Sequence, residues 1–218
     1  RRSALISLSN LGDDQMAHAK SGQWWDTEPQ RALANNSVAY KGKPEMGTFM
    51  REWVSLYESK SGERGIFNRE AAKVQAAKNG RRDWGQRFGC NPCSEIILRP
   101  YQFCNLSEVV ARASDTQQTL REKVRLATIL GTFQSTLTDF KYLRKIWQKN
   151  TEEERLLGVS LTGIMDNDLL SGTSSHLGKN IGTTLQSLRD TAVETNASMA
   201  EQLGIPQSTA ITCVKPSG

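Results

Sequence analysis

Three side chains that could act together on one small ligand lie within five residues near the middle of the chain. Asn91, Cys93 and Glu95 alternate with Pro92 and Ser94. If this segment is extended, residues i, i+2 and i+4 point to the same face, and the three side chains would share that face. A thiol beside a hydrogen-bonding amide and a carboxylate that can serve as a general base predicts an active site.

A second thiol follows soon after the first. Cys104 comes after a turn expected at residues 99–100, and two strands joined at this turn could bring it back toward Cys93. Two neighbouring thiols suggest redox chemistry. Cys213, in contrast, lies in the apolar run at residues 211–214, and we expect it to be a core residue.

Cys90 and Cys93 also form a Cys-x-x-Cys pair, a spacing found in zinc knuckles and in thioredoxin-like proteins. A thioredoxin-like motif opens a helix after a strand, whereas the residues that follow Glu95 look like a strand. A zinc ion would need two more ligands, and the remaining cysteines and histidines of the chain form no second pair that is close in sequence. These candidates are Cys104, Cys213, His18 and His176, and we expect both histidines to be exposed to solvent. We therefore predict no metal site.

Strand-like and helix-like patterns alternate along the chain. Short strands are expected at residues 1–9, 96–98, 103–106, 156–161 and 209–214. Helices are expected at residues 44–60, 68–78, 117–140 and 181–203, the last of them stopped by Gly204 and Pro206. The polar stretch at 10–43 is expected to form short helices and loops. Strands that alternate with helices of this length predict an α/β layer or barrel.

Two of the expected helices carry apolar stripes at helical spacing, which predicts that these stripes are buried. In the first helix the stripe comprises Met46, Phe49, Met50, Trp53, Val54 and Tyr57. In the third it comprises Leu126, Leu130, Phe133, Leu137 and Phe140.

The composition is that of a soluble globular protein. The chain has 218 residues, of which 37% are hydrophobic and 23% charged, and its formal net charge is +5. It contains no apolar run long enough for a membrane helix and no apolar signal region. Its basic residues are scattered. We therefore expect a cytoplasmic protein with neither a membrane nor a nucleic acid as its partner.

The ordered set of motifs resembles the ribonucleotide reductases. Asn91-Pro92-Cys93-Ser94-Glu95, followed by Phe103-Cys104-Asn105-Leu106, is similar to the finger-loop signature of this family. Four other segments agree in order and approximate spacing, so that the resemblance covers essentially the whole chain. They are Arg1-Arg2-Ser3-Ala4, Asn35-Asn36-Ser37-Val38, Leu157-Gly158-Val159-Ser160-Leu161-Thr162-Gly163 and Lys215-Pro216-Ser217-Gly218. Cys90 departs from the pattern, because the family usually has another residue there.

The resemblance implies a role for each residue of the signature. Cys93 would form the thiyl radical that takes the 3′-hydrogen of the ribose, Glu95 would accept the 3′-hydroxyl proton, and Asn91 would bind the sugar hydroxyls. Cys104 would be one of two thiols that supply electrons as the 2′-hydroxyl leaves as water.

The two ends of the chain would bind phosphates and an effector. Pro216, Ser217 and Gly218 would begin the turn that cradles the substrate phosphates through backbone N–H groups. Arg1, Arg2 and Ser3 resemble the end of the loop through which a bound deoxynucleotide effector tunes the choice of substrate.

The close spacing of Cys93 and Cys104 and the arginine pair are more similar to the adenosylcobalamin-dependent class than to the di-iron class. The resemblance thus implies a ribonucleoside-triphosphate reductase that uses adenosylcobalamin and a thioredoxin-type reductant. Residues 1–218 would form the central part of its ten-stranded α/β barrel, truncated at both ends and inactive alone. The large subunit of a di-iron diphosphate reductase is the nearest alternative. A small basic nucleotide- or nucleic-acid-binding module is an alternative of another class.

Overall fold

The computed structural model describes residues 5–60, 63–78, 80, 82–172 and 180–216. The chain divides into two compact units, unit 1 at residues 1–100 and unit 2 at residues 101–218. Each unit contains strands and helices that alternate along the chain, so the predicted α/β class is confirmed. None of the described helices is both long and apolar enough to cross a membrane.

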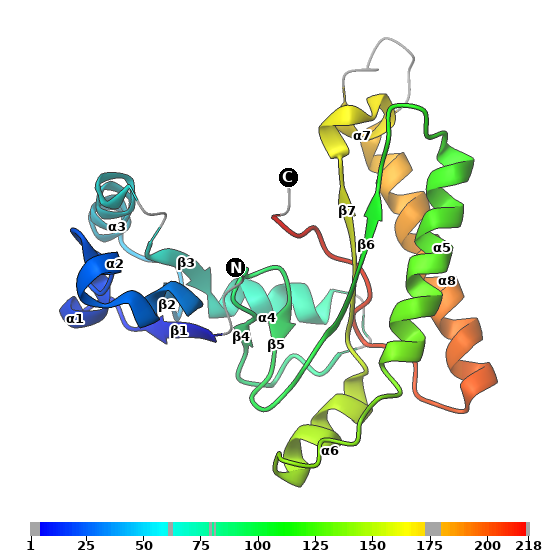
Figure 1. Ribbon diagram of the computed structural model, residues 1–218, viewed down its shortest axis with the longest axis horizontal. Helices are drawn as coiled ribbons and strands as arrows, with labels where there is room; N and C mark the ends of the chain where they lie inside the picture. Colours follow the sequence, from blue (N-terminus) through cyan, green and yellow to red (C-terminus); the bar gives the residue numbers. More distant parts are fainter. Residues whose placement is uncertain (1–4, 61–62, 79, 81, 173–179, 217–218) are drawn as a thin grey trace. The chain divides into compact units, whose positions relative to one another are not determined.

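Unit 1 is built on a parallel sheet whose strands follow the order β1-β2-β3 (Figure 1). The strands are β1 (Leu5–Ser9), β2 (Ala34–Tyr40) and β3 (Gly65–Asn68). Between β1 and β2 lie the short helices α1 (Asp14–Ala17) and α2 (Trp24–Thr27) and the 3-10 helix η1 (Pro29–Leu33). Strands β2 and β3 were not predicted, because residues 34–40 belong to the polar stretch expected to form short helices and loops, and no strand was expected at residues 65–68.

The two faces of this sheet are covered by different helices. On one face, Ala39 and Phe67 pack with Ala72 and Ala76 of α4 (Arg69–Ala77). On the other face, the ring of Tyr40 lies 6.5 Å from that of Phe49 in α3 (Met46–Ser59). Asn68 caps α4 by accepting hydrogen bonds from two backbone amides of its first turn.

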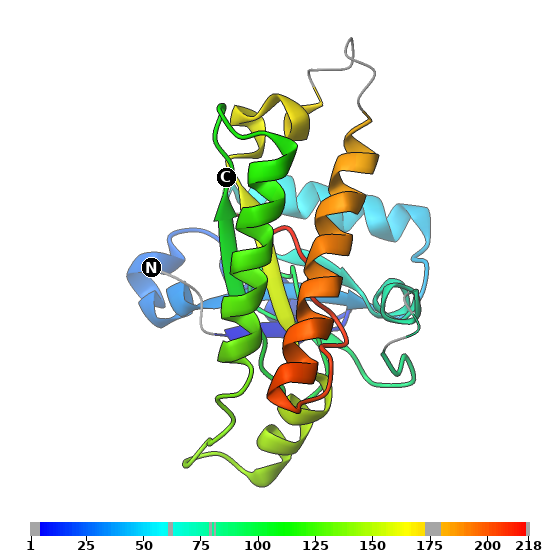
Figure 2. The same ribbon diagram turned by 90° about the vertical axis from the view of Figure 1, so that its right-hand side faces the viewer.

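Unit 2 is a β-α-β unit extended by further helices. Strands β6 (Asn105–Val110) and β7 (Leu157–Thr162) are parallel, and α5 (Gln117–Gln134) and α6 (Lys145–Glu154) lie between them in sequence. After β7 come the 3-10 helix η2 (Ile164–Asp166), α7 (Asp168–Ser171) and α8 (Ile181–Leu203). Helices α5 and α8 lie side by side against one face of the two strands (Figures 1 and 2).

The residues that α5 buries are not the ones predicted. Its buried positions are Leu120, Val124, Ala127, Thr128, Gly131 and Thr132. The part of the predicted stripe that lies in α5 faces solvent instead, with Leu130 67% and Phe133 49% exposed. The helix also ends at Gln134, six residues earlier than predicted, so that Leu137 and Phe140 lie beyond it. The helix packs closely on the strands through small side chains, since a Cβ added at Gly131 would lie 3.5 Å from Leu157. The stripe predicted for α3 was also wrong, because α3 has no buried residue.

The segment after α8 runs along the free side of β7. The backbone amides of Leu157 and Val159 donate to the carbonyls of Ala210 and Ile211, at 3.0 and 2.8 Å. An isolated parallel bridge joins Val159 to Thr212, so the strand predicted at 209–214 is reduced to a single bridge. The described strands form sheets of three, two and two strands. The ten-stranded barrel therefore stays a prediction.

Candidate active site

Asn91, Cys93 and Glu95 lie in the loop of a β-hairpin in unit 1. Its strands β4 (Gly89–Cys90) and β5 (Ile97–Leu98) are antiparallel and pair Cys90 with Ile97. The prediction of an extended segment was wrong, because the loop turns back on itself: Ser94 donates its backbone N–H to the carbonyl of Asn91 at 2.9 Å. The alternation expected of a strand therefore does not hold here. That the three side chains act on one ligand stays a prediction.

Asn91 holds the loop closed by bonding Ile96 twice. Its backbone N–H donates to the carbonyl of Ile96 at 3.2 Å, and its side-chain Oδ1 accepts from the backbone N–H of Ile96 at 3.0 Å. Pro92 follows at the second position of the turn, where its fixed φ is favourable. The carboxamide oxygen of Asn91 is thus engaged within the hairpin, and its side-chain NH2 group is the part suited to bind a ligand.

The base of the hairpin packs on the sheet of unit 1. Phe88 and Cys90 are buried in the same apolar cluster as Ala39 and Phe67. Gly89 lies so near the sheet that an added Cβ would be 3.2 Å from Leu8. The presence of Cys90 is thereby explained, since it is a core residue that anchors the hairpin.

The thiols of Cys90 and Cys93 have opposite surroundings. Burial raises the pKa of Cys90, and the nearby charge of Glu95 raises it further, whereas a hydrogen bond to Ser94 lowers it. Cys93 is exposed at the tip of the loop. Because a thiol must be accessible to react, Cys93 is the thiol of this pair that is fitted for chemistry.

Glu95 presents an unpaired carboxylate. Both of its carboxylate oxygens are buried, and neither accepts a hydrogen bond from any residue that the structure describes. Such groups are rare in folded proteins and call for a functional explanation. A proton donor brought by a ligand would satisfy this carboxylate, which is what a general base requires.

A side chain from the sheet also reaches the loop. Asn35, the second residue of β2, donates its side-chain Nδ2–H to the backbone carbonyl of Pro92. The motif Asn35-Asn36-Ser37-Val38 contributed to the family resemblance, but the sequence analysis gave Asn35 no role.

Cys104 belongs to unit 2. It is half-buried and directly precedes β6, whose first residue Asn105 donates its backbone N–H to the carbonyl of Leu156 at 2.9 Å. The expected approach of Cys104 to Cys93 stays a prediction. Cys213 is half-buried and lines an apolar pocket of about 300 Å³ between α8 and the segment beyond it.

The remaining predicted residues lie near or beyond the ends of the described chain. Pro216 is exposed, and the backbone N–H of Lys215 before it is fixed by the Ser160 hydroxyl at 2.9 Å. Outside the described residues lie Ser217, Gly218, Arg1, Arg2, Ser3 and His176. Among the described residues, no three side chains of His, Cys, Asp or Glu gather where they could hold a metal ion.

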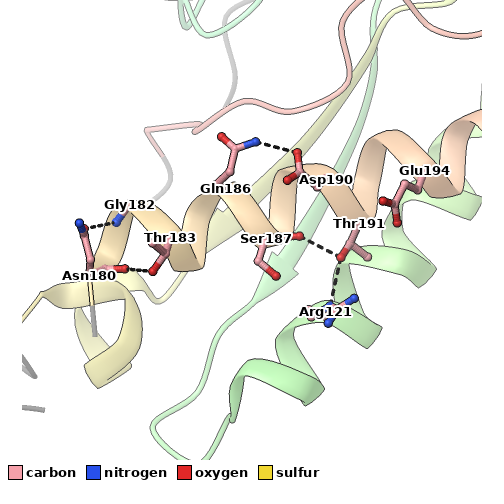
Figure 3. Close-up of a pocket in the computed structure, with 9 residues that line it drawn as sticks. All are labelled: Arg121, Asn180, Gly182, Thr183, Gln186, Ser187, Asp190, Thr191 and Glu194. Carbon is pink, nitrogen blue, oxygen red and sulfur yellow. Dashed lines mark hydrogen bonds between the residues drawn. The ribbon is translucent and has the colours of Figure 1, made fainter. Parts of the chain in front are cut away.

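A polar groove on unit 2, between α5 and the first half of α8, holds none of the predicted residues (Figure 3). Several of its side chains bond one another: Gln186 donates to Asp190 at 2.7 Å, and Arg121 donates to the Thr191 hydroxyl at 3.2 Å. The hairpin of unit 1 therefore remains the candidate active site.

Comparisons with known proteins agree with the motifs. Over its whole length, the chain is 29% identical to the adenosylcobalamin-dependent ribonucleoside-triphosphate reductase of Lacticaseibacillus paracasei. It is 30% identical to the protein of that name from Lactobacillus acidophilus. No family model matches the chain. The predicted resemblance to this class of ribonucleotide reductase is confirmed by these relatives.

The fold agrees as well. The crystal structure of a B12-dependent, class II ribonucleotide reductase matches 98% of the chain with a TM-score of 0.68 at 23% sequence identity. This likeness supports the α/β fold. The chain spans about a third of each protein, 31% and 32% of the two relatives and 32% of the solved chain.

Proposed function

We propose that the chain is the central part of an adenosylcobalamin-dependent ribonucleotide reductase, which reduces ribonucleoside triphosphates to 2′-deoxyribonucleotides for DNA synthesis. In this proposal residues 1–218 contribute strands and helices to a ten-stranded barrel, and the β4–β5 hairpin is its finger loop. Relatives with this activity in their names align with the chain from end to end, which supports the proposal.

The observation that carries the proposal is the pairing of Cys93 and Glu95 in one loop. The thiol is exposed at the tip, and the oxygens of the carboxylate two residues later are buried and accept no hydrogen bond from the residues described. A radical reduction of a ribose needs both groups, because one atom must take a hydrogen from carbon and another must take a proton from oxygen.

Each residue of the loop has one task in the proposed reaction. The Cys93 thiyl takes the 3′-hydrogen atom from the ribose and becomes a thiol. The carboxylate of Glu95 accepts the proton of the 3′-hydroxyl and so gains the partner that it lacks in the structure. The side-chain NH2 group of Asn91 donates to a sugar hydroxyl, while its Oδ1 keeps the loop closed.

The reduction is completed outside this loop. Loss of the 2′-hydroxyl as water requires two electrons and two protons, and two thiols supply them as they join in a disulfide. Cys104 is the proposed thiol of this chain, and a thioredoxin-type protein would restore the dithiol. Residues 216–218 would bind the substrate phosphates, and residues 1–3 would respond to a deoxynucleotide effector.

The exposure of Cys93 is compatible with the proposed cofactor. When bound, adenosylcobalamin supplies the organic radical that takes the hydrogen atom from the thiol. The exposed position of Cys93 on a hairpin tip fits the approach of so large a group. A thiol buried like Cys90 would be out of its reach.

The test compares two cysteine substitutions in the full-length reductase. Cys93→Ser should abolish formation of deoxynucleotide while the variant still binds ribonucleoside triphosphate. Cys90→Ala is the matched control, because it removes a thiol three positions away that takes no part in the reaction, and it should keep turnover. Unchanged turnover of Cys93→Ser would overturn the proposal. Turnover that needs iron and a second subunit, instead of adenosylcobalamin, would overturn the assignment of the class.

A further inference from the structure

The hydrogen bond from Asn35 to Pro92 joins two segments that are far apart in sequence. Asn35 lies in β2, where it pairs with Ile6 of β1, and its position is fixed by the parallel sheet. Its side chain extends from the sheet to the hairpin loop and donates to the Pro92 carbonyl. The bonds that Asn91 makes, in contrast, stay within the hairpin.

The accepting carbonyl belongs to the peptide bond between Pro92 and Cys93. A peptide unit is planar from one Cα to the next, so a bond that fixes its carbonyl oxygen also fixes the orientation of the whole plane. The plane ends at the Cα of Cys93. The bond from Asn35 therefore constrains the direction in which the Cys93 thiol leaves the loop.

The hairpin needs this constraint at its tip. Its base is anchored by Phe88, Cys90 and Ile97 in the apolar cluster. The strands, however, are only two residues long, and Cys93 lies beyond them on an exposed turn. Hydrogen bonds within a loop fix its shape but not its orientation on the sheet, and the bond from Asn35 supplies that orientation.

We propose that Asn35 is a positioning residue for the reaction, which holds the Pro92–Cys93 peptide so that the thiol is directed at the ribose. This inference rests on the proposed function. It assigns to the motif Asn35-Asn36-Ser37-Val38 a role in catalysis, which acts through Cys93 and involves no contact with the substrate.

The first test needs no activity and uses the full-length reductase. Asn35→Ala removes the donor, and Asn35→Asp replaces it by a carboxylate that cannot donate at neutral pH. Hydrogen exchange at the amides of Ser94 and Ile96 should quicken about tenfold in both variants, as expected for one lost hydrogen bond. Unchanged exchange at both amides would show that Asn35 does not hold the loop and would overturn the inference.

The matched control is Asn68→Ala. Asn68 caps α4 in the same unit through two backbone amides and donates its side-chain Nδ2–H to the carbonyl of Gly42, and none of these partners belongs to the hairpin loop. Its replacement should lower the urea midpoint of unit 1, as the loss of a helix cap does. Exchange at Ser94 and Ile96 that quickens as much in this variant as in Asn35→Ala would indicate a general loss of stability and would overturn the inference.

The second test measures turnover in the full-length reductase with adenosylcobalamin and a ribonucleoside triphosphate. Sites are counted by equilibrium binding of the substrate, so that kcat is expressed per folded site. Asn35→Ala should lower kcat about tenfold or more and leave KM within about twofold, because misplacing a reacting group affects the chemical step. Asn68→Ala should keep the kcat of the unaltered enzyme.

Cys93→Ser, measured in the same assay, separates the two hypotheses. If Cys93→Ser is inactive and Asn35→Ala keeps its full kcat per site, the proposed function stands and the positioning role is overturned. If Cys93→Ser turns over normally, the proposed function itself fails.

Discussion

Asn196 lies in the middle of α8 with 1% of its surface exposed and makes three hydrogen bonds. Its Nδ2 group donates to the hydroxyls of Thr132 and Ser208, both at 3.0 Å, and its Oδ1 accepts from the backbone N–H of Ser208 at 2.9 Å. Ser208 directly precedes the segment that runs along β7 toward Pro216. Asn196 therefore ties α5, α8 and the start of this segment together.

The cost of removing this side chain follows from these bonds. Each neutral hydrogen bond contributes about 1 kcal/mol net, so Asn196→Ala should lose about 3 kcal/mol of unfolding free energy. The loss is not recovered from water, because Ser208 is 1% exposed and its buried amide would lose Asn196 Oδ1 as its acceptor.

The assay is urea unfolding of the full-length protein, followed by hydrogen exchange of peptides from α8. Asn180→Ala is the matched control, since Asn180 caps the same helix by accepting from Gly182 at an exposed position. It should cost about 1 kcal/mol. In a double-mutant cycle, Asn196→Ala and Thr132→Val should couple by about 1 kcal/mol. The reasoning is refuted if Asn196→Ala costs no more than Asn180→Ala, or if the cycle shows no coupling.

Three further outcomes are expected. Alkylation with iodoacetamide, located by mass spectrometry, should modify the exposed Cys93 well before the buried Cys90. Because burial raises the pKa of Cys90, the rate of its alkylation should rise at higher pH. Equal rates and equal pH profiles at the two thiols would contradict the assigned burial. In thermal unfolding, Gly163→Ala should destabilise unit 2 far more than Gly172→Ala. Both glycines have positive φ, but only at Gly163 would an added Cβ lie 2.4 Å from a backbone oxygen, that of Ala111. Similar losses of stability in the two variants would count against the structure at Gly163. Leu130→Glu should change the unfolding free energy by at most about 0.5 kcal/mol, as is usual for substitutions at exposed positions. A loss of several kcal/mol would instead indicate that the stripe is buried, as predicted from the sequence.

The long helices and the class of fold could be predicted from the sequence, because their signals are local. The helix predicted at 181–203 has the bounds of α8, and Gly204 ends it in a left-handed conformation. Asparagine caps begin both α4 and α8. Caps and stop signals depend on a few adjacent residues, so they do not require knowledge of the tertiary structure.

Which face a helix buries is not a local property. The leucine and phenylalanine stripe of α5 has the expected helical spacing, yet the sheet packs against Ala127 and Gly131 on another face. A helix that packs closely on strands needs small side chains at the contact, and hydrophobic periodicity does not detect such a face. Strand β2 was not predicted for a related reason: its first residues include the polar Asn35 and Asn36, whose side-chain Nδ2 groups donate to the backbone carbonyls of Pro92 and Met16 only in the folded chain.

The loop at 91–96 has a different geometry from the predicted one, and this geometry supports the proposed site. The residue types predicted the chemistry, and an extended segment would have placed Asn91, Cys93 and Glu95 on one equally exposed face. The turn gives them different surroundings instead: Asn91 is buried, Cys93 is exposed, and the oxygens of Glu95 are buried with no hydrogen-bond partner in the described part of the chain. The three proposed tasks need three environments, since a loop must be held, a thiol must be reached, and a carboxylate out of water binds a proton donor more strongly. A turn provides such differences within five residues, whereas a regular strand repeats the same environment at every second position.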